Sequence, residues 1–385
     1  MNTNSKNIYD IIIAGAGPAG TACALALKDA GLRVAVFDKH TFPRDKVCGD
    51  AIPSRVPKVL KTISKEVAFE ISLFELKVNI HSCRVVAPNG NHVDVFFSLD
   101  GYISKRMDFD NKMAELMKKH SMAHFFEGNA ITDVTIEKEV VSVKTSEEND
   151  FQSKIIIGCD GAHSVVEKKL VDVKLDMKHH TGAVRAYYKN IQDVEEDRME
   201  IHLLQEYPSA YFWIFPLQNK TANVGFGMLS EKISKGKINL KKSLLNIITQ
   251  HPVLSKRFAK AESLDEITGF GLPMGSRRIK ISGERFMLCG DAASLIDPAT
   301  GEGIGNAMLS GMLAAEQAIK CFKQNNFSSS FMKMYDENLF KEIGKELKQK
   351  YFIQRLLGER AWLANAAVTL AAKNNFVKKQ LQKMF

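Results

Sequence analysis

Three glycines at the spacing G-x-G-x-x-G lie near the start of the chain, in the segment Gly15-Ala16-Gly17-Pro18-Ala19-Gly20. The first glycine permits a tight turn, the second lets the backbone approach a pyrophosphate, and the third lets a helix pack closely on a strand. The helix that follows would turn its N–H groups toward the phosphates. Asp38 stands 18 residues beyond Gly20, where a carboxylate bonds ribose hydroxyls. This spacing predicts dinucleotide binding, and the acid disfavours a 2′-phosphate, which leaves FAD or NAD.

A second glycine-rich stretch follows in the last third of the chain and consists of Cys289-Gly290-Asp291-Ala292-Ala293, Pro298 and Gly301-Glu302-Gly303-Ile304-Gly305-Asn306. A carboxylate after a strand can bond the hydroxyls of a ribityl chain. A glycine-rich helix start can aim its positive end at the N1–C2=O edge of a reduced flavin, which carries negative charge. NAD needs neither feature. The pair of stretches therefore favours FAD, with an ordinary strand–turn–helix capped by Asp291 as the alternative.

A third segment, Ile157-Gly158-Cys159-Asp160-Gly161-Ala162-His163-Ser164, also ends a short apolar run with an acid and a glycine. The residues alone do not separate a nucleotide contact from a turn with an aspartate cap.

The apolar pattern predicts the elements that position these residues. Residues 8–14, 21–31 and 33–39 indicate strand, helix and strand with a right-handed crossover, which is typical of a parallel sheet. A strand at 284–290 and a helix at 303–322 frame the second glycine stretch. We also expect a helix over 107–120 and a β meander from 131 that returns to the first sheet.

Alternating patterns predict a second, antiparallel sheet that forms one wall of a substrate cavity. Its strands are expected within 73–102, which contains the turn signal Asn89-Gly90, and within 180–230. Residues 231–260 and 327–385 have helical patterns. The fold class is α/β, with a Rossmann-like FAD-binding domain interleaved with an antiparallel-sheet substrate domain, plus C-terminal helices. The expected boundaries are 1–75, 103–170 and 276–325 for the first domain, 76–102 and 171–275 for the second, and 326–385 for the helical segment.

Composition narrows the class of protein. The chain has 385 residues, of which 45% are hydrophobic and 25% charged, with no apolar stretch long enough to span a bilayer. From the first ten residues we expect no secretory signal. We expect a cytoplasmic protein and a monomer. The six cysteines have irregular spacing, so we expect neither a metal site nor a disulfide framework, and we expect all but Cys48 to be small buried residues.

The net charge of +9 raises the question of an anionic partner. Lysines are densest in 231–260 and 333–385, where they alternate with apolar residues at helical spacing. This distribution favours solvated helix faces and argues against nucleic acid. Contact of the basic, amphipathic tail with the inner face of a membrane is the alternative.

The three motifs, in this order, resemble the p-hydroxybenzoate hydroxylase-type flavoprotein superfamily. Two further segments resemble its geranylgeranyl reductase family over about residues 8–325. One is Phe42-Pro43-Arg44-Asp45-Lys46-Val47-Cys48-Gly49-Asp50, which is similar to P-R-x-K-x-C-G. The other is Pro208-Ser209-Ala210-Tyr211-Phe212-Trp213-Ile214-Phe215-Pro216 with Ala222-Asn223-Val224-Gly225, which is similar to P-x-x-Y-x-W-x-F-P and N-V-G. Arg106 with Phe109-Asp110 matches the family's R-x-x-F-D.

The resemblance implies FAD as the cofactor and places Asp160-Gly161 near the path of NAD(P)H. The residues expected to hold FAD are Gly15, Gly17, Pro18, Ala19, Gly20, Asp38, Lys39, Arg44, Cys48, Gly49, Arg106, Ala130, Asp160, Gly161, Gly290, Asp291, Pro298, Gly301, Gly303, Ile304 and Gly305.

The expected reaction adds hydride from reduced FAD to a carbon–carbon double bond of a prenyl or other lipid-like substrate. Cys48, Tyr211 and Trp213 are the catalytic candidates. The thiol is either a proton donor or merely a small residue against the flavin ring, and the two aromatic side chains share one face of a strand, as an apolar slot or as plain sheet core. NAD(P)H or a reduced redox protein would reduce the flavin. The rivals are an FAD-dependent monooxygenase or halogenase and a flavin-free prenyl-binding carrier.

Overall fold

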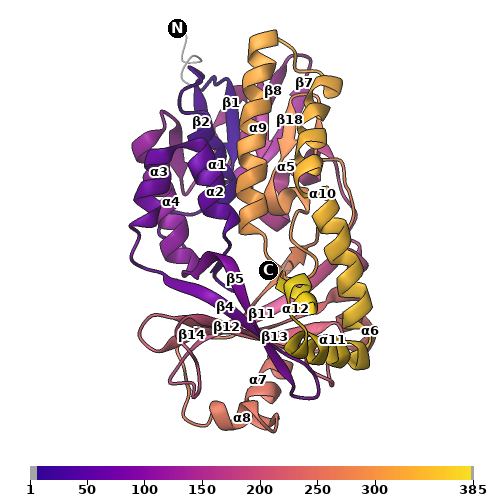
Figure 1. Cartoon of the computed structure of the whole chain (residues 1–385). Helices are drawn as coiled ribbons and strands as arrows, with labels where there is room; N and C mark the ends of the chain where they lie inside the picture. Colours follow the sequence, from indigo (N-terminus) through magenta and orange to yellow (C-terminus); the bar gives the residue numbers. More distant parts are fainter. Residues whose placement is uncertain (1–6, 383–385) are drawn as a thin grey trace.

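A six-stranded sheet organises the upper half of the molecule in Figure 1, and its neighbouring strands are parallel except at one edge. The computed structural model describes residues 7–382. The strand order is β17 (Ser282–Gly283), β18 (Phe286–Leu288), β10 (Ile155–Gly158), β1 (Ile11–Ala14), β2 (Val34–Asp38) and β6 (His124–Glu127). Apart from Asp38 at the end of β2, the central strands carry no charged or polar side chain, because both faces of this sheet are covered.

Helices cover one face of the six-stranded sheet, and α1 (Pro18–Ala26) and α9 (Ile304–Gln324) lie side by side there (Figure 1). A Cβ atom on Gly311 of α9 would lie 2.1 Å from the carbonyl oxygen of Ala19, so only glycine allows this approach. The two glycine-rich turns are thereby held next to each other. Nearby lie α2 (Arg55–Ile63), α3 (Lys65–Ser72) and α4 (Arg106–His120).

The expected meander forms a small sheet of β7 (Ile131–Glu137), β8 (Val140–Thr145) and β9 (Asp150–Ser153) before the chain enters β10. Its apolar residues belong to the same core as the parallel sheet. The turn η1 (Gly161–His163) and helix α5 (Val165–Leu170) follow β10.

A nine-stranded sheet forms the lower half (Figure 1). Its pairs are antiparallel except for β12 (Arg198–His202) with β4 (Val78–Val86), which joins the strands expected within 73–102 to those expected within 180–230. Its order is β15 (Glu262–Ser263), β11 (His180–Lys189), β14 (Thr221–Leu229), β13 (Ala210–Leu217), β12 (Arg198–His202), β4 (Val78–Val86), β5 (His92–Ile103) and β3 (Ala51–Ile52), with β16 (Thr268–Pro273) paired to β11.

The two faces of the nine-stranded sheet have different neighbours. Phe212 and Ile214 of β13 pack toward a core that includes α7 (Leu240–Gln250). Trp213 and Phe215 belong to a separate cluster on the opposite face, as strand alternation requires. The odd-numbered face of β13 turns toward the six-stranded sheet and forms one wall of a cavity.

The helical pattern over 231–260 is confirmed and consists of three separate helices. They are α6 (Ser230–Gly236), α7 and α8 (Leu254–Arg257). Lys237 has φ +48° and ends α6. His251 precedes a proline and is extended, which ends α7. Strands β6 and β3 were not predicted from the sequence.

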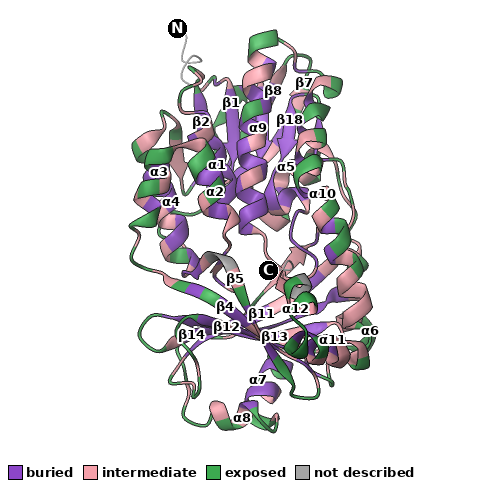
Figure 2. Ribbon diagram, in the orientation of Figure 1, coloured by how far each residue is buried: buried purple, intermediate pink, exposed green. Residues whose placement is uncertain are grey.

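The C-terminal segment is helical as expected, with α10 (Ser329–Gly358), α11 (Ala361–Lys373) and α12 (Asn375–Gln382). Figure 2 shows buried positions along α10. Met332, Tyr335, Leu339 and Ile343 belong to the core of the parallel-sheet half, so the first part of this helix is structural. Among residues 7–382 no helix is both long and apolar enough to cross a membrane. The domain boundaries stay a prediction.

Candidate functional site

A cavity lies between the six-stranded and nine-stranded halves and encloses about 1500 Å³, its open mouth included. Its wall includes the start of α1, the 46–49 loop, the 300–304 turn and the odd-numbered face of β13. Segments far apart in the sequence thus meet at one place. The lining residues that the sequence had singled out are Pro18, Cys48, Gly49, Arg106, Tyr211, Trp213, Asp291, Gly301, Gly303 and Ile304.

The first glycine turn has the tight geometry that its spacing predicts. Gly15 has φ +95°, and a Cβ atom there would lie 2.4 Å from the carbonyl oxygen of Cys159. A Cβ atom on Gly20 would lie 1.8 Å from the carbonyl oxygen of Gly15. At Gly17, by contrast, the nearest atom to such a Cβ is Nη2 of Arg44, at 3.6 Å. Gly15 and Gly20 therefore serve packing, whereas Gly17 leaves a gap facing a cation, which fits a pyrophosphate.

The acid at the end of β2 lies beside this turn. Asp38 is buried, and its carboxylate accepts hydrogen bonds from the backbone N–H of Ala16 at 2.8 Å and of His40 at 2.9 Å. The backbone N–H of Asn129 donates to the carbonyl oxygen of Asp38, which brings Ala130 to the same end of the site. This end suits an adenosine ribose. Lys39 is exposed next to Asp38.

Arg44 and Arg106 converge on one buried acid. Asp110 accepts from Arg44 at 2.9 Å and from two nitrogens of Arg106 at 2.8 and 2.6 Å. Although burial opposes ionisation of Asp110, the charge and hydrogen bonds of Arg106 hold the pKa of that carboxyl below its usual value. Two arginines on one carboxylate leave a net positive charge between Gly17 and the cavity, which suits an anionic cofactor.

The second glycine turn lies next to the first. Gly290 has φ +59°, and its N–H donates to Ser310 of α9 at 3.0 Å. Asp291 bonds Lys46 Nζ at 2.9 Å, which links this turn to the 42–50 loop. Gly303 is the N-cap of α9, so the positive end of the helix faces the cavity. Both features fit a ribityl chain and an anionic flavin edge.

A hydrogen-bond network fixes the backbone at Cys48. Asn223 donates to the carbonyl oxygen of Cys48 and to Asp50, each at 2.8 Å, and accepts from Trp213 Nε1 at 2.9 Å. Asp50 also accepts from the Tyr187 hydroxyl at 2.7 Å. Burial raises the pKa of Asp50 to about 6 although these donors oppose the rise. The network gives a structural role to Asp50 and Asn223. Both stand in the quoted sequence motifs, but the sequence analysis did not assign them to the site.

The aromatic wall is built on β13. The rings of Tyr211 and Trp213 lie on the same face, with centroids 5.7 Å apart, as their alternation predicts. The Tyr211 hydroxyl donates to the carbonyl oxygen of Thr300 at 2.7 Å, which ties this wall to the second glycine turn. A Cβ atom on Gly225 of β14 would lie 2.1 Å from the Trp213 ring, so the N-V-G glycine makes room for that ring.

A second cavity adjoins the first behind Tyr211, Thr300 and Gly301, which line both. Its wall is mainly apolar and includes Leu204 and Met228 of the lower half, with Ile353 and Leu357 of α10 and Ala364 and Val368 of α11. Pro298 lines this second cavity rather than the first. The C-terminal helices thus enclose apolar space next to the glycine turn.

The third motif lies beside the cavity but not in its wall. Asp160 accepts from the Ser164 hydroxyl at 2.5 Å and from Val165 N–H at 2.6 Å, and so holds the start of α5. Gly161 in η1 packs next to the 290–293 turn. Its expected contact with the cofactor and with NAD(P)H stays a prediction. Of the six cysteines, Cys48 alone is partly exposed and the rest are buried.

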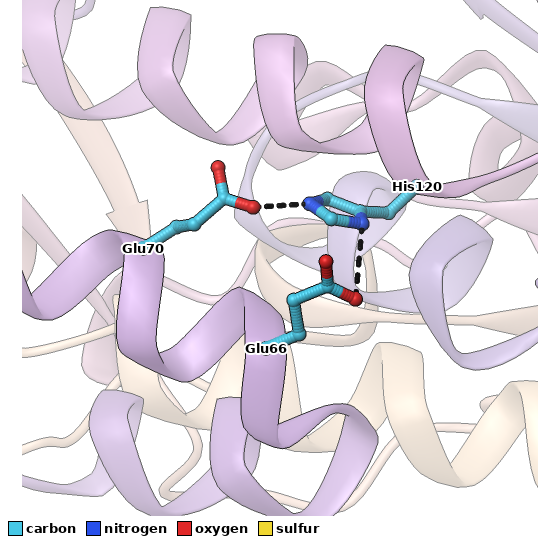
Figure 3. Close-up of side chains that lie close together, drawn as sticks. All are labelled: Glu66, Glu70 and His120. Carbon is cyan, nitrogen blue, oxygen red and sulfur yellow. Dashed lines mark hydrogen bonds and ion pairs between the residues drawn. The ribbon is translucent and has the colours of Figure 1, made fainter.

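Among the described residues one group of side chains has the composition of a metal site (Figure 3), and none of its members lines either cavity. His120 at the end of α4 contacts Glu70 at 2.6 Å and Glu66 at 3.7 Å, both on α3. Lys119 also pairs with Glu70 at 2.8 Å. With a cation already on Glu70, the group acts as an ion-pair cluster that joins the two helices.

Parallel strands, two facing glycine turns and an acid at the end of β2 define a flavin- and dinucleotide-binding protein. The chain belongs to the FAD binding domain family, whose model matches residues 106–337, more than half of the chain. A model described as pyridine nucleotide-disulphide oxidoreductase matches residues 9–187. The protein is an FAD-dependent oxidoreductase, as the sequence predicted.

Individual relatives agree with the predicted resemblance. A digeranylgeranylglycerophospholipid reductase of Methanoculleus marisnigri is 28% identical over 91% of this chain and 86% of its own length. A geranylgeranyl bacteriochlorophyll reductase-like structure from Thermoplasma acidophilum has a TM-score of 0.82 at 23% identity and covers 98% of this chain and 100% of its own. A flavin-dependent brominase has a TM-score of 0.76 at 19% identity over 96% and 92% of the two chains. These likenesses confirm the expected fold and the resemblance to geranylgeranyl reductases.

Proposed function

We propose that this protein reduces carbon–carbon double bonds of a prenyl or other lipid-like substrate. The observation that carries the proposal is the pairing of an FAD-type glycine turn with an aromatic wall across one cavity, continued by a second apolar cavity. A flat alkene fits between such walls, and the second cavity offers room for a long hydrocarbon chain. The names of the reductase relatives point to the same substrate class.

The residues present fit FAD. The gap at Gly17 beside Arg44 suits the pyrophosphate, and Asp38 suits the adenosine ribose. Asp291 suits the ribityl chain, and the N-terminus of α9 suits the N1–C2=O edge of the flavin. When bound, reduced FAD supplies the hydride for the double bond. The protein's own part is to fix the Cys48 loop through Asn223, to present Tyr211 and Trp213 as an apolar wall, and to exclude water with that wall.

Purified protein loaded with FAD tests the proposal. Dithionite-reduced enzyme is mixed anaerobically with digeranylgeranylglycerophospholipid, and mass spectrometry counts the hydrogens gained. We expect a gain of two hydrogens per double bond together with return of the oxidised-flavin spectrum. Reoxidation that requires oxygen and yields a hydroxylated or halogenated product would instead support the monooxygenase or halogenase rival. A protein that binds the lipid but no FAD would support the carrier.

The electron donor, the membrane contact and the oligomeric state complete the proposal. NAD(P)H or a reduced redox protein is the proposed donor, and the protein is proposed to act as a monomer. The tail presents large exposed apolar side chains, namely Phe352, Trp362 and Phe376 at 66%, 68% and 70% exposure, beside Lys378 and Lys379. Aromatic and basic residues together suit an anionic membrane surface. Such a contact would bring a lipid close to the second cavity.

A further inference from the structure

Reduction of an alkene needs a proton as well as a hydride. We propose that Glu302 is the acid that donates this proton. The inference rests on the alkene reduction proposed above and assigns a residue that the sequence displayed within the second glycine turn but left without a role.

The position of Glu302 supports the assignment. Glu302 precedes the N-cap of α9 and lines the first cavity together with Cys48, Tyr211 and Trp213. Within residues 7–382 its carboxyl group makes no hydrogen bond to another side chain or to the backbone, although its main chain bonds Asp297 and Thr300. A carboxyl group that faces a cavity without a fixed partner is free to give its proton to a bound molecule.

Burial, with the surrounding charges as a smaller influence, keeps part of this acid protonated near neutral pH. Lys350 of α10 pairs with Asp297 at 2.6 Å and with Glu346 at 3.0 Å, and Arg55 of α2 pairs with Glu346 at 2.6 Å. The two cations near Glu302 are thus already paired with other acids. Burial, and then the charge of Asp297, raise the pKa of Glu302 to about 7, although Lys350 and Arg55 act in the opposite direction. A general acid works best with a pKa near the operating pH.

The other acids of the cavity are poorer donors. The Tyr211 hydroxyl already donates to Thr300, and burial raises its pKa. Burial also raises the pKa of Tyr102. Asp291 is held by Lys46 at 2.9 Å. The Cys48 thiol is the remaining rival, so the experiment must separate it from Glu302.

The proposed step conserves atoms, protons and electrons. One carbon of the double bond gains a hydride and the other gains the proton from a Glu302 carboxyl oxygen, while the π bond between them breaks. The two electrons come from the reduced flavin, which is left oxidised. Glu302 is left as a carboxylate and regains a proton from water at the mouth of the cavity.

The first test compares E302Q with C48S, and uses E316Q as the matched control because Glu316 is exposed on the same helix α9. Dithionite-reduced protein is mixed anaerobically with digeranylgeranylglycerophospholipid, and flavin reoxidation is followed across pH. In wild-type protein and E316Q we expect the rate to fall as pH rises through about 7, because the protonated acid is then lost. We expect E302Q to be slower by about 100-fold or more and to lose this pH dependence.

The second test needs no cofactor. In infrared titration of the apoprotein, the C=O band of a protonated carboxylic acid should vanish near pH 7 in wild type and E316Q. The same component should be absent from E302Q. Subtraction of the E302Q spectra isolates Glu302 from Asp50, whose pKa is also raised. Thermal unfolding of E302Q checks that the fold is intact.

The outcomes separate the two proposals. Wild-type enzyme that reduces the lipid, with E302Q equally fast or with the pH dependence lost in C48S instead, would overturn the assignment of Glu302 alone. A Glu302 band that vanishes near pH 4.5 would overturn it as well. Wild-type enzyme that binds FAD but reduces no double bond would overturn the proposed function and, with it, this donor.

Discussion

The two walls of the cavity are built in opposite ways. The wall that carries the glycine turns includes Pro18, Gly301 and Gly303, and behind it the backbone is so closely packed that Gly15 and Gly20 have no space for even one methyl group. The wall on β13 is made of large side chains, with Tyr211, Trp213 and Phe215 in a row. A backbone wall recognises a cofactor shared by many enzymes, whereas a side-chain wall can change with the substrate. The choice of residue is therefore sterically restricted at the glycine turns and less restricted on the wall formed by β13.

Replacement of Gly15 by alanine tests the backbone wall and should have the largest effect. The new Cβ would lie 2.4 Å from the Cys159 carbonyl at φ +95°, so neither backbone can yield. We expect a loss of about 4 kcal/mol in the free energy of unfolding, from left-handed strain plus overpacking, and loss of FAD. Gly31→Ala is the matched control, because Gly31 also has positive φ (+67°) but no neighbour within 4 Å of the new Cβ. If Gly15→Ala and Gly31→Ala lost equal amounts of unfolding free energy in denaturant and equal amounts of bound FAD, the steric argument would be contradicted.

Asp50→Asn tests the network that joins the two walls. The raised pKa of Asp50 means that the folded state holds its proton more tightly than the unfolded chain, so its contribution to stability is full below pH 3.8 and is lost as pH rises through about 6. The difference corresponds to about 3 kcal/mol. Wild-type protein should therefore lose stability over this interval relative to Asp50→Asn.

Denaturant unfolding between about pH 3.5 and about pH 7.5, which spans the two pKa values, measures this effect. Asp29→Asn, at an exposed position, should keep the wild-type profile. Parallel stability curves for wild type and Asp50→Asn would rule out the buried carboxyl as the cause.

Gly225→Ala tests the side-chain wall. The added methyl group would overlap the Trp213 ring at 2.1 Å and break its bond to Asn223. Because a side chain can move where a backbone cannot, we expect a smaller loss of about 2 kcal/mol, with FAD binding kept and alkene reduction strongly reduced. Gly227→Ala on the same strand is the control, since its Cβ would have no atom nearer than 3.6 Å. Denaturant unfolding, FAD titration and product analysis compare Gly225→Ala with Gly227→Ala. Loss of FAD in Gly225→Ala would contradict the proposal that the two walls serve the cofactor and the substrate separately.

The smallest effect on stability is expected outside both walls. Trp362 and Phe376 are exposed, so their joint replacement by serine should leave unfolding within about 0.5 kcal/mol of wild type. The same variant should bind vesicles containing anionic lipid more weakly in sedimentation. Leu245→Ser and Val253→Ser, exposed on the lower half away from the tail, provide the control. Unchanged vesicle binding would refute the proposed membrane contact.

Much of the nucleotide half was predictable because its signals are local. A glycine spacing, an apolar run and an acid at its end specify a turn, a strand and a ligand within a few tens of residues, and the pairing of β1 with β2 follows from the crossover. Strand β6, with its short and only partly buried run, has no such signal. The helical pattern over 231–260 is confirmed, but it did not show that positions 237 and 251 divide the segment into three helices.

The sequence by itself predicted a dinucleotide site at Gly15, Gly17, Gly20 and Asp38, and it determined the tight glycine turn there, because backbone geometry of this kind is local. Only the tertiary structure decided that Asn223 donates a hydrogen bond to Cys48, that Tyr211 donates one to Thr300, and that α10 and α11 enclose a second cavity. These contacts join residues far apart in the chain. They depend on how two sheets meet, which no local pattern encodes.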